Sequence, residues 1–156
     1  MKVAFKKILV GVDSSEPSAR AVRVASSMAF QMAAEVMLVH VVVRVATTNG
    51  GGNDSRARLQ GGARRTRQAL LRRARRGFEP PTVVGESLRE GVPADEMLKC
   101  AATWEAQLIV VGAHVHSRLG RLILGSTADA VARGAHCPVV TVGDDADAAR
   151  AVSSSS

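Results

Sequence analysis

The sequence contains few aromatic residues and few cysteines. Only 3% of its 156 residues are aromatic, with one Trp, three Phe and no Tyr, so the core must be filled by Val, Ala, Leu and Ile. That composition suits a parallel sheet covered by alanine-faced helices. The two cysteines, Cys100 and Cys137, show no metal-ligand spacing and lie in apolar segments, as reduced core residues do. A cytoplasmic location is therefore expected.

Long hydrophobic runs and familiar enzyme motifs are also absent. The apolar run after Lys6 and Lys7 stops at Asp13, which is too short for a signal peptide or a membrane span. The chain has no Gly-x-Ser-x-Gly elbow, no Gly-x-x-x-x-Gly-Lys-Ser/Thr loop and no His-Glu-x-x-His pair. His114 and His116 lack a third ligand nearby, so no metal site is expected. We predict a binding protein rather than an enzyme.

Positive charge is concentrated in one segment. The formal net charge is +7, and nine of the 21 basic residues lie between residues 56 and 76, where there is no Asp or Glu. Helical periodicity over 63–77 turns Ala63, Leu70, Leu71 and Ala74 inward and Arg65, Arg72 and Arg76 outward. Binding of nucleic acid or polyphosphate stays open as an alternative, but an arginine block on one helix is more often a solvated face. Nucleic acid is therefore not the expected partner.

Apolar runs alternate with helical patterns along the chain. Strands are predicted at 6–12, 35–43, 82–86, 108–111 and 137–142, each too short for a helix and rich in β-branched residues. Helices are predicted from Ser15, with Pro17 in the first turn, and over 63–77, 91–104 and 126–134. The glycine-rich stretch 47–62 is predicted to be a loop.

This alternation predicts one α/β domain over 1–143, followed by a disordered tail at 144–156. Right-handed crossovers would allow an open, doubly wound parallel sheet of five strands in the order 3-2-1-4-5, with helices on both faces. In that order, the strand order reverses between the first and fourth strands, and ligands bind in the crevice at the carboxyl ends of these two strands. Asp13 and Gly112 should then face one cleft.

The segment 107–129 predicts an anion site. A buried strand breaks at Gly112, and Gly125, Ser126 and Thr127 precede a helix with Ser126 as N-cap and Asp129 three residues on, as in a capping box. Free backbone N–H groups and the positive end of the helix dipole would face whatever lies above. The most fitting anion is phosphate.

These residues carry a family resemblance. The segment is similar to the phosphate loop of the universal stress protein family, whose pattern is Gly, two residues, Gly, nine residues, then Gly-Ser or Gly-Thr. Gly112, Val115 and Gly125-Ser126 stand at those spacings, with valine in place of the second glycine. A valine forced into a left-handed conformation would cost about 1–2 kcal/mol, so either the loop follows another path, turning at Gly120, or it holds phosphate less firmly.

The resemblance covers about residues 5–142 and implies an adenine nucleotide alpha hydrolase-like fold that binds ATP, with Mg²⁺ as an optional companion. It implies that Asp13 contacts the nucleoside, that Val41 contacts adenine and that the glycine loop holds phosphates. The residues to which these binding roles carry over are Val12, Asp13, Val41, Gly112, Val115, Gly125, Ser126 and Thr127. Each also has a structural explanation: Asp13 could only begin a turn, Ser126 could only cap a helix and Val41 could only fill the core.

Side chains beyond the backbone loop could also meet phosphate. His114, His116, Arg118 and Arg121 could neutralise charge that Val115 displaces, although they could equally be exposed loop residues. His40 is interpreted as a packed histidine at a strand end. At most slow ATP hydrolysis is expected, because no residue is visibly placed to activate water.

The resemblance implies a stress-response regulator acting as a homodimer. The apolar edge at 139–142 would be covered if two copies paired there across a twofold axis. The alternative is a member of the same family that has lost nucleotide binding through Val115 and works by protein interaction alone.

Overall fold

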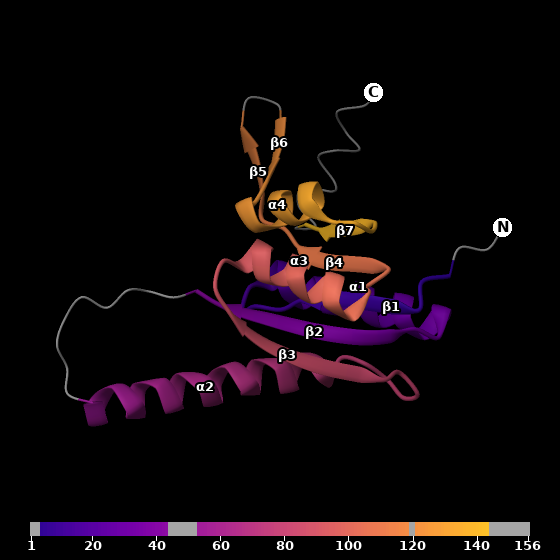
Figure 1. The fold of residues 1–156 in the computed structure, drawn as a ribbon. Coiled ribbons are helices and arrows are strands. Elements are labelled where there is room, and N and C mark those ends of the chain that lie inside the picture. Colours follow the sequence, from indigo (N-terminus) through magenta and orange to yellow (C-terminus); the bar gives the residue numbers. More distant parts are fainter. Residues whose placement is uncertain (1–3, 44–52, 119–120, 144–156) are drawn as a thin grey trace.

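The computed structural model describes residues 4–43, 53–118 and 121–143. Five short strands form one parallel sheet in the order β3-β2-β1-β4-β7 (Figure 1). The predicted strand order is confirmed, with β7 as the fifth parallel strand. The strands are β1 (Lys7–Gly11), β2 (Glu35–Val42), β3 (Val84–Glu90), β4 (Leu108–Gly112) and β7 (Val139–Val142).

Four helices cover the two faces of this sheet, as predicted. They are α1 (Glu16–Met32), α2 (Asn53–Arg75), α3 (Pro93–Trp104) and α4 (Ser126–Gly134). Helices α1 and α2 pack on one face, where Ala21 and Leu71 join the core, and α3 and α4 pack on the other, where Met97 and Val131 are buried. The domain therefore has three layers.

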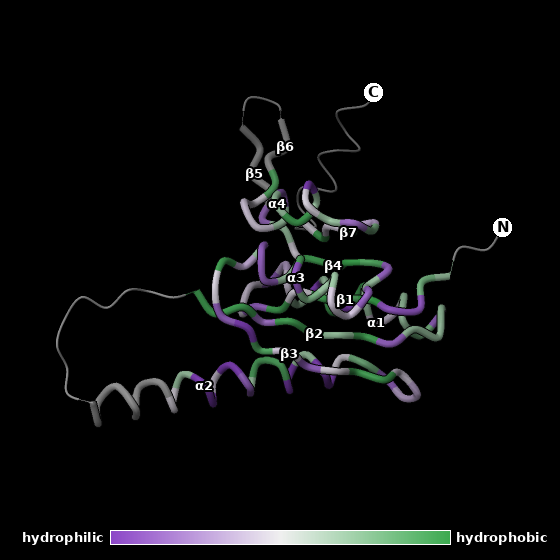
Figure 2. Tube along the Cα trace, in the orientation of Figure 1, coloured by the Kyte–Doolittle hydropathy of each residue, from purple (hydrophilic) through white to green (hydrophobic). Residues whose placement is uncertain are grey.

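Alternate residues of each central strand enter opposite halves of the core. Ile8 and Val10 of β1 pack under α1, whereas Leu9 between them packs under α3. Because both faces of the strand are covered, the sequence is apolar without alternation. Figure 2 shows the resulting concentration of hydrophobic residues along β1 and β4.

The start of α1 follows the sequence signal closely. Ser15 is the N-cap, and its side chain accepts a hydrogen bond from the Ser18 N–H at 3.3 Å, while Pro17 lies in the first turn. Pro17 has no N–H to leave unsatisfied, so this position costs it no hydrogen bond. The prediction of a helix start at Ser15 is confirmed.

Helix α2 begins earlier than expected. The loop prediction for 47–62 is wrong from Asn53 onward, because the helix runs through Gly61 and Gly62 to Arg75; residues 47–52 lie outside the described part of the chain. A glycine inside a helix costs about 1 kcal/mol relative to Ala. Good helix formers on both sides and the packing of Leu70 and Leu71 on the core offset that cost.

Strand β3 is longer than the predicted 82–86. It pairs with β2 from Val36 opposite Val84 to Val42 opposite Glu90, so the backbone hydrogen bonds of β2 extend it past its short apolar start. The predicted disordered tail at 144–156 lies outside the described residues.

Candidate functional site

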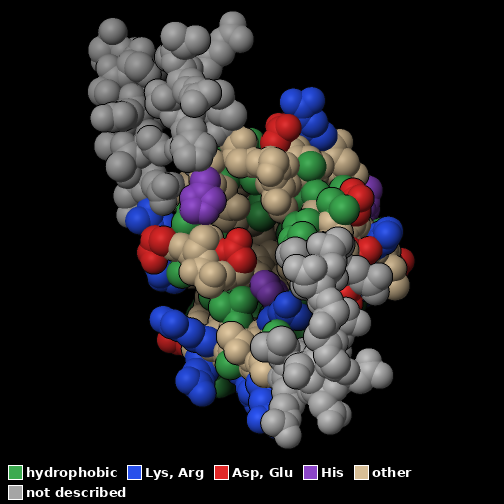
Figure 3. All heavy atoms as spheres, turned by 90° about the vertical axis from the view of Figure 1, so that its left-hand side faces the viewer, with side chains coloured by type: hydrophobic (Ala, Val, Ile, Leu, Met, Phe, Trp, Pro, Cys, Tyr) green, Lys and Arg blue, Asp and Glu red, His purple; other side chains and the backbone are tan. Residues whose placement is uncertain are grey.

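A cavity of about 450 Å³ opens at the carboxyl ends of β1, β2 and β4 (Figure 3). The chain leaves β1 toward β2 on one side and returns to β4 on the other, so the cavity lies where the strand order reverses. Asp13 and Gly112 both line it, as expected. Seven of the eight predicted site residues line the cavity, and the side chain of the eighth, Val115, lies outside the described part of the chain; the seven are Val12, Asp13, Val41, Gly112, Gly125, Ser126 and Thr127.

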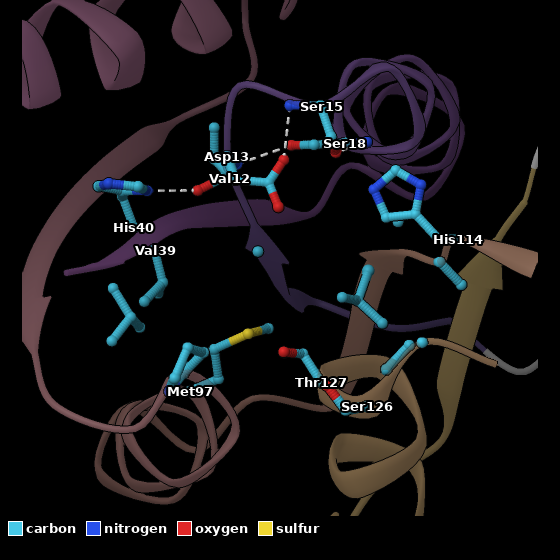
Figure 4. Close-up of a pocket in the computed structure, with 18 of the residues that line it drawn as sticks. Val12, Asp13, Ser15, Ser18, Val39, His40, Met97, His114, Ser126 and Thr127 are labelled. Atoms are coloured by element: carbon cyan, nitrogen blue, oxygen red, sulfur yellow. Dashed lines mark hydrogen bonds between the residues drawn. The ribbon is translucent and has the colours of Figure 1, made fainter. Parts of the chain in front are cut away.

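The exit from β1 forms a rigid turn that presents Asp13. The Asp13 N–H donates to Ser18 Oγ at 2.8 Å, and Asp13 Oδ1 accepts from the Ser15 N–H at 2.7 Å (Figure 4). One carboxylate oxygen thus closes the turn. The other oxygen is available to a ligand, and Asp13 is exposed on the cavity side. The structural and functional explanations of Asp13 are therefore compatible.

His40 lies at the end of β2 and lines the same cavity. Its Nδ1 is 2.7 Å from the carbonyl oxygen of Val12, and because that oxygen can only accept, Nδ1 must carry the proton. The Val12 N–H in turn donates to the Val39 oxygen at 2.8 Å. His40 is packed at a strand end, as predicted, but its place in the cavity wall was missed. A polar residue at the carboxyl end of an apolar strand was the available signal.

Gly112 at the end of β4 is required by packing. A Cβ on Gly112 would lie 2.4 Å from the carbonyl carbon of Pro17 and 2.6 Å from the Ser18 nitrogen, a backbone contact that cannot relax cheaply. From the family resemblance we expected this glycine to belong to the loop that holds phosphates. The structure gives a sufficient reason within the fold.

The segment after Gly112 folds as a hairpin rather than an open loop. Strands β5 (Val115–Arg118) and β6 (Arg121–Leu124) pair antiparallel, with Val115 opposite Leu124 and Arg118 opposite Arg121. Of the two alternatives that Val115 left open, the loop follows another path, because Val115 lies in an extended strand that suits a β-branched residue and needs no left-handed conformation. The expected turn at Gly120 lies outside the described residues, as do the positions of the hairpin side chains 115–118 and 121–123.

The hairpin returns the chain to the cavity at the start of α4. Gly125, not Ser126, is the N-cap, and no side chain caps the helix. The predicted capping box is therefore wrong: Ser126 is already helical, and Asp129 Oδ2 contacts Arg133 Nε at 3.0 Å, one turn onward. First-turn N–H groups have no partner within the helix, so those of Ser126 and Thr127 stay available at the cavity wall.

The electrostatics of the cavity wall are simple. The lining residues that the structure describes include one carboxylate, Asp13, two histidines, His40 and His114, and no Lys or Arg. His114 is exposed and has no hydrogen-bond partner in the described part of the chain. An anion in this cavity would be met by backbone N–H groups and imidazoles.

The thiols and the possible metal ligands that the structure describes form no second site. Cys100 is buried and Cys137 half-buried, both are free thiols, and burial raises the pKa of Cys137. Among the described residues, no three His, Cys, Asp or Glu side chains are placed to hold a metal ion. No described helix is both long and apolar enough to cross a membrane.

Comparison with known proteins identifies the family. Residues 4–143 match the model of the universal stress protein family. The chain belongs to this family. It is 32% identical over 139 residues to universal stress protein MJ0531 of Methanocaldococcus jannaschii, and the match covers 88% of this chain and 82% of that protein. The proposed resemblance is confirmed.

Solved structures share the fold of this universal stress protein. A universal stress protein in complex with cAMP superposes with a TM-score of 0.68 at 26% identity, covering 90% of this chain and 98% of that one. The universal stress protein from Archaeoglobus fulgidus in complex with dAMP gives a TM-score of 0.59 at 23% identity, covering 90% and 99%. Both confirm the doubly wound α/β fold.

Proposed function

We propose that this universal stress protein binds an adenine nucleotide, with ATP as the expected ligand, in the cavity between β1 and β4. The observation that supports this most strongly is the convergence on one cavity of the Asp13 carboxylate, the end of β2 at Val41 and the uncapped start of α4. These are an acceptor, a strand edge and an anion-binding helix end, placed around a space of about 450 Å³. Structural neighbours with bound cAMP and dAMP support the choice of an adenylate.

Each part of the nucleotide has a matching group. The free oxygen of Asp13 would accept hydrogen bonds from ribose hydroxyls, and the backbone at Val41 would read the edge of adenine. The N–H groups of Gly125, Ser126 and Thr127 would bind phosphate oxygens at the positive end of α4. Val12 and Gly112 would form the floor between them, and Val115 would act only by placing the hairpin.

The binding mode is that of a regulator rather than a fast enzyme. Helix-end amides can hold phosphates in place but supply no group that activates water. With one carboxylate in the described wall, Mg²⁺ would arrive with the nucleotide, coordinated chiefly by its phosphates. We propose that the bound state is read by a partner during the stress response in the cytoplasm.

A homodimer would complete the sheet. Among the described strands, β7 pairs with β4 alone, and Val139, Val140 and Val142 remain half-buried at this edge. Pairing of two β7 strands across a twofold axis would cover them. Light scattering should then report twice the chain mass of 16.3 kDa. A species of the single mass at micromolar concentration would refute the dimer.

Calorimetric titration with Mg-ATP and AMP tests the proposed function. Asp13→Asn keeps an oxygen for the Ser15 N–H but turns an NH₂ donor toward the ligand where the wild type has an acceptor. We expect wild-type binding and a loss of at least about tenfold in Asp13→Asn, or about 1.4 kcal/mol. Glu79→Gln, at an exposed carboxylate on another part of the surface, is the control and should bind as the wild type does. Absence of heat with any adenylate at millimolar concentration would instead favour a universal stress protein that acts through protein contacts alone.

A further inference from the structure

Helix α2 presents a surface of arginines that the nucleotide cavity does not use. Leu71 is buried, and Leu70 and Ala74 pack against the core, so the opposite side of the helix faces solvent. Of the arginines on α2 and just after it whose side chains are described, all but Arg67 are exposed. The exposed ones are Arg64, Arg65, Arg72, Arg73, Arg75 and Arg76, and Arg67 is half-buried.

Three of these arginines form a row, which we call the α2 arginine row. Arg65 and Arg72 are seven positions apart, so they lie on one stripe of α2. Arg76 follows in the turn just after the helix, four positions beyond Arg72, and its N–H donates to the Arg72 carbonyl at 3.3 Å, so it continues the stripe. At 1.5 Å per residue, their α-carbons stand about 10 Å and about 6 Å apart along the axis. Figure 3 shows Lys and Arg side chains gathered low on the molecule, at the height of α2 in Figure 1.

The row has no acidic partner among the residues that the structure describes. In the described part of the chain, the ion pair made by this segment joins Arg75 to Glu86 at 3.4 Å, and Arg65, Arg72 and Arg76 make none. Like charges spaced at helical turns repel one another. The positive charge of the α2 arginine row is therefore not neutralised by described acidic residues, and an anionic partner would stabilise it.

The side chains on and around the α2 arginine row limit the classes of partner that it fits. Arginine binds phosphate bidentately through its planar fork. The exposed residues of 61–76 include no Leu, Ile, Phe or Trp, so this face lacks the apolar side with which an amphipathic helix enters a membrane. It also lacks the aromatic platforms on which single-stranded bases stack. The partner that best fits evenly spaced arginines without apolar or aromatic neighbours is a regular, rigid array of phosphates.

We propose that the α2 arginine row docks on the phosphate backbone of double-stranded nucleic acid without reading its bases. This departs from the expectation based on sequence composition, which treated the arginine block as a solvated face. The inference is independent of nucleotide binding, because the row lies outside the cavity wall.

The test is binding of a labelled DNA duplex by fluorescence anisotropy over a range of salt concentrations, with the full chain. We expect affinity independent of base sequence and a steep fall with salt. In the triple variant Arg65→Gln, Arg72→Gln, Arg76→Gln, the slope of log K against log salt should shrink by about three, one for each phosphate that an arginine no longer neutralises. Circular dichroism should show an unchanged fold, since all three side chains are exposed.

A matched variant separates the row from net charge. Arg23→Gln, Lys99→Gln, Arg133→Gln removes the same charge from exposed positions on α1, α3 and α4 and should keep the wild-type slope. An equal loss in both triple variants would overturn the proposal, as would a strong base-sequence preference. Binding only to polyphosphate, to anionic lipid vesicles or to an acidic protein would also overturn it. ATP titration of the same variants should be unchanged, so failure here leaves the proposed function intact.

Discussion

Gly112 at the end of β4 packs directly against Pro17 at the start of α1, and a Cβ on Gly112 would lie 2.4 Å from the Pro17 carbonyl carbon. This contact fixes how the helix leaves the turn that carries Asp13. We predict that Gly112→Ala forces the two elements apart and lowers the free energy of unfolding by about 1–3 kcal/mol. Urea denaturation measures this. A change below about 0.5 kcal/mol would show that α1 shifts without cost.

Gly125 offers the matched comparison in the same cavity. Its φ is −56°, and a Cβ there would come no closer than 3.6 Å to His114, which is ordinary contact. Gly125→Ala should therefore leave stability within about 0.5 kcal/mol of the wild type. The added methyl group should nevertheless crowd the phosphate at the start of α4 and weaken adenylate binding about tenfold, or about 1.4 kcal/mol. Unchanged affinity would place the phosphate elsewhere.

The hydrogen bond from His40 to the Val12 carbonyl should make a measurable contribution to stability. His40→Phe removes the Nδ1–H that satisfies the Val12 carbonyl, and we expect a loss of about 1–3 kcal/mol in the free energy of unfolding. His136→Phe, at an exposed histidine, is the control. Nitrogen chemical shifts of neutral His40 should report a proton on Nδ1. A proton on Nε2 alone would contradict the assignment.

Glu96 should make stability depend on acid pH. Hydrogen bonds from Lys99 and from Arg89, each 3.0 Å long, hold the pKa of Glu96 below its ordinary value of 4.5. A lowered carboxyl pKa contributes stability that is present above the ordinary value and is lost as the pH falls through the folded-state value. Glu96→Gln should thus be less stable than the wild type at neutral pH, and the difference should vanish in strong acid.

The control for this pH experiment is Glu79→Gln. Glu79 is exposed and has no ion pair in the part of the chain that the structure describes. The substitution breaks no ion pair that the structure describes, so its difference from the wild type should be small. A Glu96→Gln difference that stayed constant from neutral to acid pH would show that packing, rather than charge, accounts for the effect.

The sheet could be predicted from sequence because its information is local. A continuous apolar run such as residues 108–111 is buried on both faces, which in this domain means a strand between two helical layers. Ser15 with Pro17 marks a helix start through contacts within one turn. Crossover handedness allows the observed strand order, and the family resemblance implied it. Asp13 and Gly112 were expected in one cleft because strand ends of a parallel sheet meet at one edge. The roles of the other predicted lining residues came from the family resemblance.

The features that the sequence did not predict depend on contacts between residues beyond their immediate neighbours in the chain. Gly112 and Pro17 are far apart in the chain, so no local pattern could reveal that packing excludes a side chain there. The β5–β6 hairpin is held by pairing of Val115 with Leu124 rather than by an alternating apolar pattern. Ser126 resembles an N-cap in sequence, but the hairpin brings the chain in one residue earlier, so that Gly125 takes that position.

The most direct test is a nuclear magnetic resonance titration of the ¹⁵N-labelled protein with Mg-ATP. We predict that the amide signals of Val41, Gly125, Ser126 and Thr127 shift together and saturate with a single dissociation constant. Signals of these residues that stay in place at millimolar ATP, or shifts confined to other surfaces such as α2, would contradict it.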